Sequence, residues 1–193
     1  MLTVWCVCTG DKYNSGHVYA LKRMVNKHLS ERFVFKCVTE KTIHGVFCVK
    51  PKVLYKSWWD KFNLFWLANG PSIYFDLDVV ITGNLDYLVA FTKHDLAAPA
   101  NWGQSGHGGI QSSVMCWSGQ IRPELSEDDI DRLHGDQCLL TEMYGDTYIK
   151  IPRVYSYKYH SRSHLPDDAS VVCFHGKPDY WEVNHRWIDQ ALS

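Results

Sequence analysis

The sequence predicts an α/β fold with a mainly parallel central sheet. Segments with the apolar pattern of strands alternate with segments of helical spacing through the first half of the chain, which is typical of parallel strands joined by helices. Of the 193 residues, 46% are hydrophobic and 14% are aromatic, which is enough for a sizeable core. The sequence has no internal repeat and no linker-like stretch. We therefore expect one domain that spans residues 1–193.

The first predicted elements follow one another closely. Residues 2–9 are rich in Val, Trp and Cys and indicate a buried strand that ends at Thr-Gly-Asp. Residues 18–29 place apolar side chains at helical spacing after a turn with helix-capping residues, so they predict a helix. A second strand is predicted at 33–38 and a short third strand at 45–49.

The later elements surround a polar motif and a glycine-rich loop. An aromatic-rich helix is predicted at 58–68, and it ends at Asn-Gly-Pro before a strand at 72–75. Three more strands are predicted, at 95–99, 113–117 and 170–174, and one more helix is predicted at 135–143. The glycine-rich residues 102–109 predict a mobile loop, which is either an active-site lid or a plain surface loop.

Hydropathy and cysteine usage predict the compartment. No apolar run reaches the roughly 18 residues that a membrane span needs, and the first residues lack the basic region and cleavage site of a signal peptide. The seven cysteines are scattered in mostly apolar surroundings without a Cys-x-x-Cys pair, which favours buried free thiols over a zinc site. Free thiols are typical of a reducing compartment, so we expect a soluble, cytoplasmic protein.

The net charge of −1 conceals an asymmetry along the chain. Residues 1–61 contain 11 Lys+Arg and 4 Asp+Glu, a balance of +7, whereas residues 62–193 contain 9 and 17, a balance of −8. A basic half is typical of proteins that bind a polyanion or a phosphorylated ligand. Solvated helix and loop faces would give the same balance, and charge alone does not decide between the two.

Two carboxylates stand one residue apart at the end of an apolar strand. Asp76 and Asp78 lie within Ile-Tyr-Phe-Asp-Leu-Asp-Val-Val, and open α/β sheets bind ligands at the carboxyl ends of their strands. Strand alternation would point the two side chains to opposite faces, so they can share one ion only where the strand ends and turns. Mg²⁺ and Mn²⁺ prefer such oxygen ligands. The alternative is a pair of loop carboxylates that cap the next element.

Around this motif the sequence resembles the DxD region of GT-A glycosyltransferases, most of all the glycogenin and galactosyltransferase-like group, family 8. The matching residues of this region are 61–67, 73–81 and 84–86. Further segments agree in the order of the family: Thr9-Gly10-Asp11-Lys12-Tyr13, Ala97-Ala98-Pro99, Gln111-Ser112-Ser113-Val114-Met115, Gly135-Asp136-Gln137-Cys138 and Phe174-His175-Gly176-Lys177-Pro178. The resemblance implies the GT-A fold, a Rossmann-like fold of nucleotide-diphospho-sugar transferases.

The resemblance also implies a role for each matching residue. Asp76, Asp78 and His175 would bind Mn²⁺ or Mg²⁺, which neutralises the charge that develops on a departing diphosphate. Asp136 and Gln137 would be catalytic and would face the donor sugar, with retention of anomeric configuration. The donor would be a nucleotide-diphosphate sugar, most simply a UDP-sugar, and its expected contacts are Thr9, Gly10, Asp11, Tyr13, Lys61, Asp76, Leu77, Gln111, Ser112, Gly176 and Lys177.

Some choices stay open at this point. His175 could equally be a satisfied core histidine, and Lys61 and Lys177 could be solvated surface lysines. Gln111 and Ser113 replace the asparagine and glycine that are usual in the family, so the donor sugar is open. The acceptor is open as well: a glycan, a lipid-linked sugar, a protein or a modified nucleic acid.

Two other functions fit part of the pattern. A haloacid-dehalogenase-like phosphatase would use Asp76 as nucleophile and Asp78 as acid/base. That fold normally begins with this strand, but here 75 residues precede Asp76, and Val80 stands where that family has threonine. A non-catalytic carbohydrate-binding protein would use the aromatic residues, 8 Trp and 11 Tyr, as stacking faces. The metal motif argues against the second.

Overall fold

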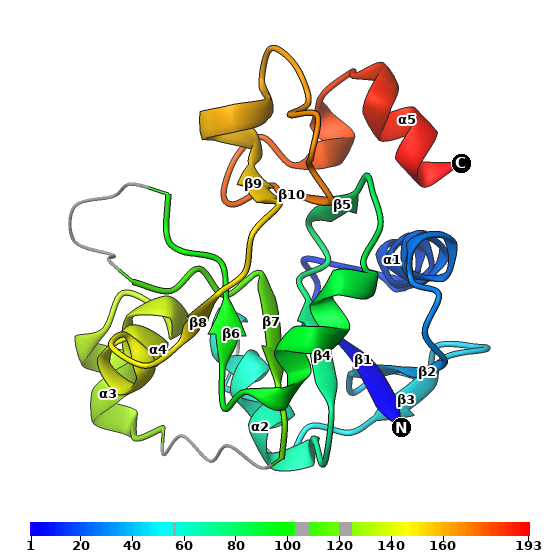
Figure 1. The fold of residues 1–193 in the computed structure, drawn as a ribbon. Coiled ribbons are helices and arrows are strands. Elements are labelled where there is room, and N and C mark those ends of the chain that lie inside the picture. Colours follow the sequence, from blue (N-terminus) through cyan, green and yellow to red (C-terminus); the bar gives the residue numbers. More distant parts are fainter. Residues whose placement is uncertain (56, 103–108, 120–124) are drawn as a thin grey trace.

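The computed structural model describes residues 1–55, 57–102, 109–119 and 125–193. A seven-stranded sheet of order β3-β2-β1-β4-β7-β6-β8 runs through its centre (Figure 1). The pairs β1–β2, β1–β4, β2–β3 and β6–β8 are parallel, and only β7 runs against its two neighbours, β4 and β6. The strands are β1 Leu2–Val7, β2 Phe33–Val38, β3 Phe47–Val49, β4 Ser72–Phe75, β6 Ala97–Ala98, β7 Val114–Trp117 and β8 Ile149–Lys150. The prediction of an α/β fold with a mainly parallel sheet is confirmed.

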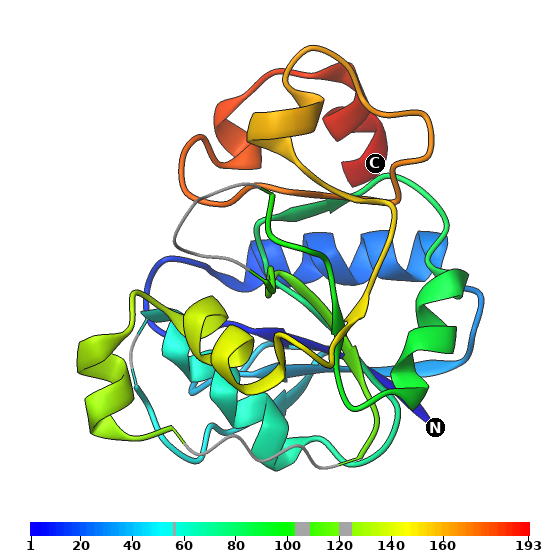
Figure 2. The same cartoon turned by 60° about the vertical axis from the view of Figure 1, so that its left-hand side comes forward.

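A second, smaller sheet lies beyond the first helix. It has the order β5-β10-β9, and its strands are Val79–Ile81, Val171–Cys173 and Val154–Ser156. Helix α1 lies between the two sheets (Figure 2), and α5 packs against both α1 and β5. The small sheet brings the C-terminal region of the chain next to the strand that directly follows Asp78.

The two faces of the central sheet carry separate apolar clusters. On β1, Val4 and Cys6 pack with α1 and the small sheet, whereas Trp5 packs on the opposite face with α2 and α4. The strand alternation therefore serves two cores, because both faces of a mostly parallel sheet are covered. The helices are α1 Ser15–His28, α2 Asn63–Leu67, α3 Glu127–Arg132, α4 Asp136–Tyr144 and α5 Arg186–Leu192, and shorter 3-10 or π turns are Ser57–Phe62, Asp86–Lys93, Tyr157–Ser161 and Tyr180–Glu182.

The predicted helix at 58–68 is the element that differs most. It is a 3-10 turn at Ser57–Phe62 followed by the five-residue α2. The side chain of Asn63 donates to the backbone oxygens of Val53, at 2.8 Å, and Asp60, at 3.0 Å. Asp60 in turn accepts from the backbone nitrogen of Tyr55 at 2.7 Å. Such side-chain bonds compete with regular helical hydrogen bonds, which explains why the helix is short and irregular.

The remaining expectations have mixed outcomes. All seven cysteines are free thiols, and five of them are buried, as expected. The glycine-rich loop falls mostly on residues 103–108, which lie outside the described residues. Across the described ranges, no helix is both long and apolar enough to cross a lipid bilayer.

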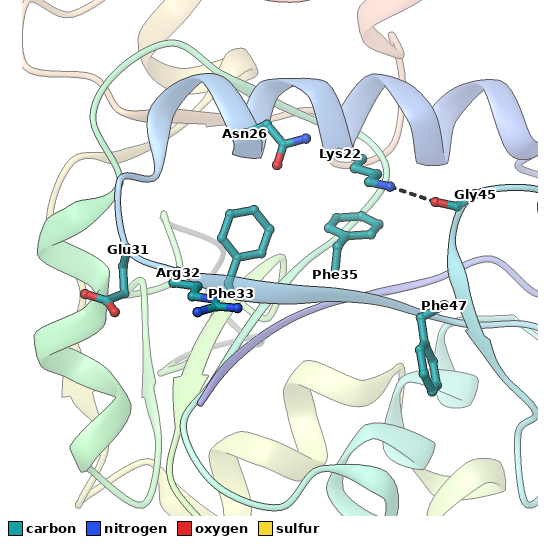
Figure 3. Close-up of a pocket in the computed structure, with 8 residues that line it drawn as sticks. All are labelled: Lys22, Asn26, Glu31, Arg32, Phe33, Phe35, Gly45 and Phe47. Carbon is teal, nitrogen blue, oxygen red and sulfur yellow. Dashed lines mark hydrogen bonds between the residues drawn. The ribbon is translucent and has the colours of Figure 1, made fainter.

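A surface hollow of about 400 Å³ lies beside α1 and the edge of the central sheet (Figure 3). Its lining residues are Lys22, Asn26, Glu31, Arg32, Phe33, Phe35, Gly45 and Phe47, and none of them is a predicted site residue. Lys22 donates to the backbone oxygen of Gly45 at 2.7 Å, which joins α1 to the loop before β3. Part of the positive charge of residues 1–61 therefore lies on this face rather than at the Asp76-Leu77-Asp78 motif.

Candidate active site

The two motif carboxylates lie at a turn between two strands. Strand β4 ends at Phe75, Asp76 follows it, and Leu77 and Asp78 form the turn into β5. The sequence had required a strand end at this point if both carboxylates were to act together, and the structure has one. Because β7 runs antiparallel to β4, its beginning lies at the same sheet edge, and the backbone nitrogen of Asp76 donates to the backbone oxygen of Ser113 at 2.9 Å.

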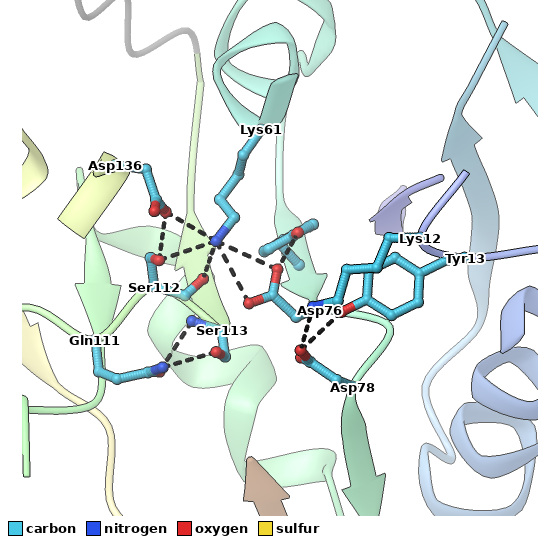
Figure 4. A network of polar contacts seen from close by, with 10 residues as sticks. Lys12, Tyr13, Lys61, Asp76, Asp78, Gln111, Ser112, Ser113 and Asp136 are labelled. Atoms are coloured by element: carbon cyan, nitrogen blue, oxygen red, sulfur yellow. Dashed lines mark hydrogen bonds and ion pairs between the residues drawn. The ribbon is translucent and has the colours of Figure 1, made fainter. Parts of the chain in front are cut away.

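Lys61 is the centre of a buried polar network (Figure 4). Its Nζ lies 2.8 Å from Oδ2 of Asp136, 3.2 Å from Oδ1 of Asp76 and 2.9 Å from Oγ of Ser112. The Ser112 hydroxyl also donates to Asp136, and the Tyr74 hydroxyl donates to Asp76. The lysine side chain is only 6% exposed, so the network joins the ends of β4, β7 and α4 away from bulk water.

The network sets the charge of its members. Burial alone would lower the pKa of Lys61, but attraction to Asp136 and Asp76 outweighs it, and the pKa lies above its ordinary value. Burial, and then the negative charge of Asp76, raises the pKa of the Tyr74 hydroxyl. Lys61 is therefore a permanent cation, and Tyr74 a permanent hydrogen-bond donor, on the Asp76 side of the site.

Asp78 lies on the other side of the motif, facing α1. Its Oδ2 accepts from the Tyr13 hydroxyl at 2.7 Å and lies 3.4 Å from Nζ of Lys12, whose side chain is 60% exposed. Burial, and then the charge of Asp76, raises the pKa of Asp78 to about 6. The two carboxylates are therefore close enough to repel each other. Lys12, the Tyr13 hydroxyl and the more distant Lys61 lower the pKa of Asp78 without cancelling that repulsion, and no buried cation among the described residues is in contact with Asp78.

The predicted His-Gly-Lys turn lies next to Asp78. The backbone nitrogen of Phe174 donates to the backbone oxygen of Asp78 at 3.0 Å. The His175 ring stacks on the rings of Trp102 and Tyr159, and its Nε2 lies 2.6 Å from Oγ of Ser156. Burial, and then the charge of Lys158, lowers the pKa of His175. Topology thus brings a motif about 100 residues away in sequence to the Asp78 end of the site.

Lys177 is engaged locally. Its Nζ lies 2.6 Å from Oδ2 of Asp179 and 2.7 Å from Oε1 of Glu182, and its side chain is 72% exposed. Gly176 before it has a φ of +72°, a conformation that favours glycine. The chain therefore turns at Gly176, as the His-Gly-Lys motif predicts. The carboxylates of Asp179 and Glu182 neutralise the charge of Lys177.

The predicted metal ligands fit a cation only in part. Asp76 and Asp78 supply the oxygen donors that Mg²⁺ and Mn²⁺ prefer, and their mutual repulsion is what a cation would relieve. Within the ranges that the structure describes, however, no three or more His, Cys, Asp or Glu side chains are grouped so that they could hold a metal ion. His175 is near the pair in the fold, but it is not in ligand geometry with it.

The predicted nucleotide loop is held by its neighbours. The Thr9 hydroxyl donates to Oδ2 of Asp60 at 2.6 Å, and the backbone nitrogen of Gly10 donates to Oε1 of Glu40 at 2.9 Å. Asp11 has a fully exposed side chain and an ion pair with Lys41 at 3.3 Å. Tyr13 is the residue of this loop that reaches the motif carboxylates.

The predicted sugar-facing residues divide into two groups. Ser112 and Asp136 are bound to each other and to Lys61. Gln111 folds back on its own strand instead, where Nε2 donates to Oγ of Ser113 at 2.7 Å. Oε1 of Gln137 accepts from Asn101 at 3.4 Å. Asp136 is therefore central to the site, whereas the two glutamines have local partners.

Sequence reasoning missed several residues of the site. Tyr74 stands two positions before Asp76, so strand alternation could have placed both on one face. Lys12 stood inside a matching segment but had no role of its own. Ser156 is the last residue of β9, a strand that the sequence did not predict, and Lys158 follows it; no sequence pattern singled them out.

The comparisons with known proteins concern the fold. No protein-family model matches the chain, and no curated protein matches it at the sequence level. The glycosyltransferase GlyE of Streptococcus pneumoniae TIGR4 superposes with a TM-score of 0.71 at 15% identity, over 94% of this chain and 57% of that one. The galactosyltransferase LgtC, solved with donor and acceptor sugar analogs, superposes with a TM-score of 0.63 at 13% identity, over 97% of this chain and 91% of LgtC.

A third structure gives the same result. The bifunctional glycosyltransferase WbbM superposes with a TM-score of 0.63 at 10% identity, over 93% of this chain and 46% of WbbM. The chain thus spans little more than half the length of GlyE and most of LgtC. At these identities the likeness concerns the fold. The Lys61 network and Asp78 therefore lie at the strand ends of a fold that this chain shares with these solved glycosyltransferase structures.

Proposed function

We propose that this chain is a glycosyltransferase of GT-A type that moves a sugar from a nucleotide-diphosphate donor, a UDP-sugar in the first instance, to an acceptor. One observation carries the proposal: at the carboxyl end of β4, Asp76 and Asp136 share a buried lysine, and Asp78 lies two residues further along the same turn. Open α/β sheets bind ligands at this edge. We propose residues 1–193 as a single catalytic unit.

Asp76 and Asp78 are the proposed ligands of a divalent cation, Mn²⁺ or Mg²⁺. When bound, the cation supplies positive charge to the diphosphate as it leaves. His175 is the proposed third ligand, and its imidazole would have to leave the hydrogen bond to Ser156 to serve in that role. Tyr13 fixes the orientation of the Asp78 carboxylate through its hydroxyl.

The donor sugar would lie over the Asp136 side. Lys61 and Ser112 hold the Asp136 carboxylate in one orientation, so its second oxygen is directed without further reorganisation. Gln137, the next residue of α4, would contact the same sugar, and Gln111 with Ser112 would bind its hydroxyls. Retention of configuration is part of the proposal. Thr9, Gly10, Asp11 and Tyr13 form the proposed nucleoside side, and Leu77 and Gly176 are the proposed diphosphate contacts, with Lys177 as the lysine that the sequence motif indicates for them.

A donor-hydrolysis panel tests the proposal because it needs no acceptor. The purified chain is incubated with UDP-, GDP- and CDP-sugars in the presence of Mn²⁺, Mg²⁺ or a chelator, and released nucleotide is measured. We expect hydrolysis of at least one donor with metal and none with the chelator. Hydrolysis of phosphate monoesters instead would support the phosphatase alternative, which the fold comparisons do not favour.

Asp78→Ala sharpens the test. Calorimetry should show that Mn²⁺-dependent binding of uridine diphosphate is lost, because one of two carboxylate ligands is gone, while the protein remains folded. Asp146→Ala removes the same charge from an exposed position after α4 and serves as the matched control. Wild-type affinity in the Asp78→Ala protein would falsify the assignment of the motif. Binding without turnover of any donor would favour the non-catalytic carbohydrate-binding alternative.

A further inference from the structure

Two lysines lie beside the His175–Gly176 turn, and their surroundings differ. Lys177 is neutralised by Asp179 and Glu182, as described above. Lys158 forms no ion pair with any carboxylate that the structure describes. The Lys158 residue is half-buried. Lys158 is therefore a partly buried cation without a described carboxylate partner, next to the turn where the donor diphosphate is proposed to bind.

The position of Lys158 is defined through Gly176. A Cβ atom added at Gly176 would lie 3.0 Å from Nζ of Lys158, so the ammonium group sits directly against the backbone of the turn. A side chain there would displace the ammonium group by a few tenths of an ångström, and glycine also suits the φ of +72°. The absence of a side chain at Gly176 therefore gives Lys158 its place next to the turn.

The element that carries Lys158 is firmly anchored. Tyr157–Ser161 is a π turn, a rare element that is frequent at functional sites. The Tyr157 ring stacks on Phe174 with centroids 4.4 Å apart, and its hydroxyl lies 2.9 Å from Nε2 of His185. Phe174 is in turn bonded to the backbone of Asp78. Tyr157, the neighbour of Lys158 in the chain, is thus connected to Asp78 through Phe174.

We propose that Lys158 supplies the fixed cation for the donor diphosphate at this corner, in place of Lys177. The inference rests on the proposed function, since it concerns the same donor. The His175–Gly176 turn borders the position of Nζ. A diphosphate at this turn would receive a charge-assisted hydrogen bond that none of the described carboxylates takes. Lys177 instead stabilises the Asp179–Glu182 cap that follows the turn.

Calorimetric titration with uridine and with uridine diphosphate, each with excess Mn²⁺, tests the inference. Lys158→Gln should weaken uridine diphosphate binding about tenfold or more, since one charged hydrogen bond is lost, and leave uridine binding unchanged. Lys158→Arg should recover most of the affinity. A merely structural role for Lys158 would weaken both ligands equally and would not show recovery by arginine.

Two matched lysines complete the design. Lys150→Gln removes the same charge from an exposed position on β8 and should leave both affinities as in the wild type. Lys177→Gln should give a smaller loss than Lys158→Gln. If Lys158→Gln does not fold, Lys158→Met is used in its place, because methionine keeps the aliphatic part of the lysine side chain and removes only the charge.

The outcomes separate the two proposals. If the wild-type chain binds uridine diphosphate and Lys158→Gln binds it equally well, the Lys158 inference is wrong and the proposed function stands. If Lys177→Gln loses more affinity for uridine diphosphate than Lys158→Gln does, the diphosphate is bound by Lys177, the lysine of the sequence motif, and the Lys158 inference is wrong. If the wild-type chain binds no nucleoside diphosphate with Mn²⁺, the proposed function fails and the inference fails with it.

Discussion

The two carboxylates of the Asp76-Leu77-Asp78 turn lie in contrasting surroundings. Asp76 belongs to a buried network in which Lys61 also holds Asp136, and Ser112 and Tyr74 provide further hydrogen bonds. Asp78 faces α1, where its partners are one hydroxyl and one largely exposed lysine. Only the first carboxylate has a buried cation. On the Asp76 side, two carboxylates thus share one buried cation, whereas on the Asp78 side the described residues place no buried cation in contact with the carboxylate.

This difference indicates a division of labour within the site. A compensated, hydrogen-bonded network keeps its geometry before any ligand arrives, which suits residues that position a sugar. An under-compensated carboxylate next to a second one is a place where an added cation lowers the free energy. The Asp76 side is therefore expected to matter for folding, and the Asp78 side for ligand binding.

Lys61→Met should show the largest effect on stability. It leaves Asp76 and Asp136 without their shared cation, and breaking a buried ion pair by removing one partner costs about 3 to 5 kcal/mol. Urea unfolding in the presence of a chelator measures the free energy of unfolding. Because Asp76 is 23% exposed, the lower end of that range is expected. A decrease in the free energy of unfolding of less than about 1 kcal/mol would contradict the conclusion that Lys61 stabilises the fold through buried ion pairs.

Asp78→Asn should have a pH-dependent effect in the metal-free protein. The raised pKa, about 6, means that ionised Asp78 destabilises the folded state above pH 6, and this cost disappears as the pH falls and the folded protein takes up a proton before the unfolded chain does. The variant should be more stable than the wild type by about 3 kcal/mol at pH 7. The difference should vanish towards pH 4. A difference that does not depend on pH would show that Asp78 is not desolvated.

Ser112→Ala tests the hydroxyl that joins Lys61 to Asp136. Both charged partners remain, so the expected loss of stability is about 1 to 2 kcal/mol, the usual range for one hydrogen bond to a charged group. Thermal and urea unfolding measure it. Ser118→Ala, after the other end of β7, is a control with the same chemical change. An equal loss in both variants would mean that the network adds nothing at Ser112.

Lys12→Met should have the smallest effect. Its ion pair with Asp78 is 3.4 Å long and its side chain is 60% exposed, and such pairs contribute about 0 to 1 kcal/mol. The free energy of unfolding of Lys12→Met should hardly differ from that of the wild type. This small difference should not change with salt concentration. If Lys12→Met is as damaging as Lys61→Met, the two sides of the site are electrostatically alike and the comparison fails.

Much of the fold was predictable because local patterns agree with it. Strands β2 and β4 have the predicted bounds, since apolar runs flanked by turn residues leave little choice. Helix α1 begins three residues before the prediction, at Ser15, because Asn14 and His17 form a capping box. The small sheet was largely missed. Strands β5 and β9 have three residues each, and such short strands form only when their partner is in place.

The sequence by itself determined the fold class, the strand end at Asp76 and the free thiols. These depend on apolar periodicity and turn chemistry, which are properties of neighbouring residues. Only the tertiary structure decided which charges pair: that Lys61 is a buried clamp, that Lys177 is neutralised by Asp179 and Glu182, and that Lys158 is free of carboxylate partners among the described residues. The reason is that the pairing and burial of a charge depend on groups brought together from distant parts of the chain, and local sequence does not encode those distances.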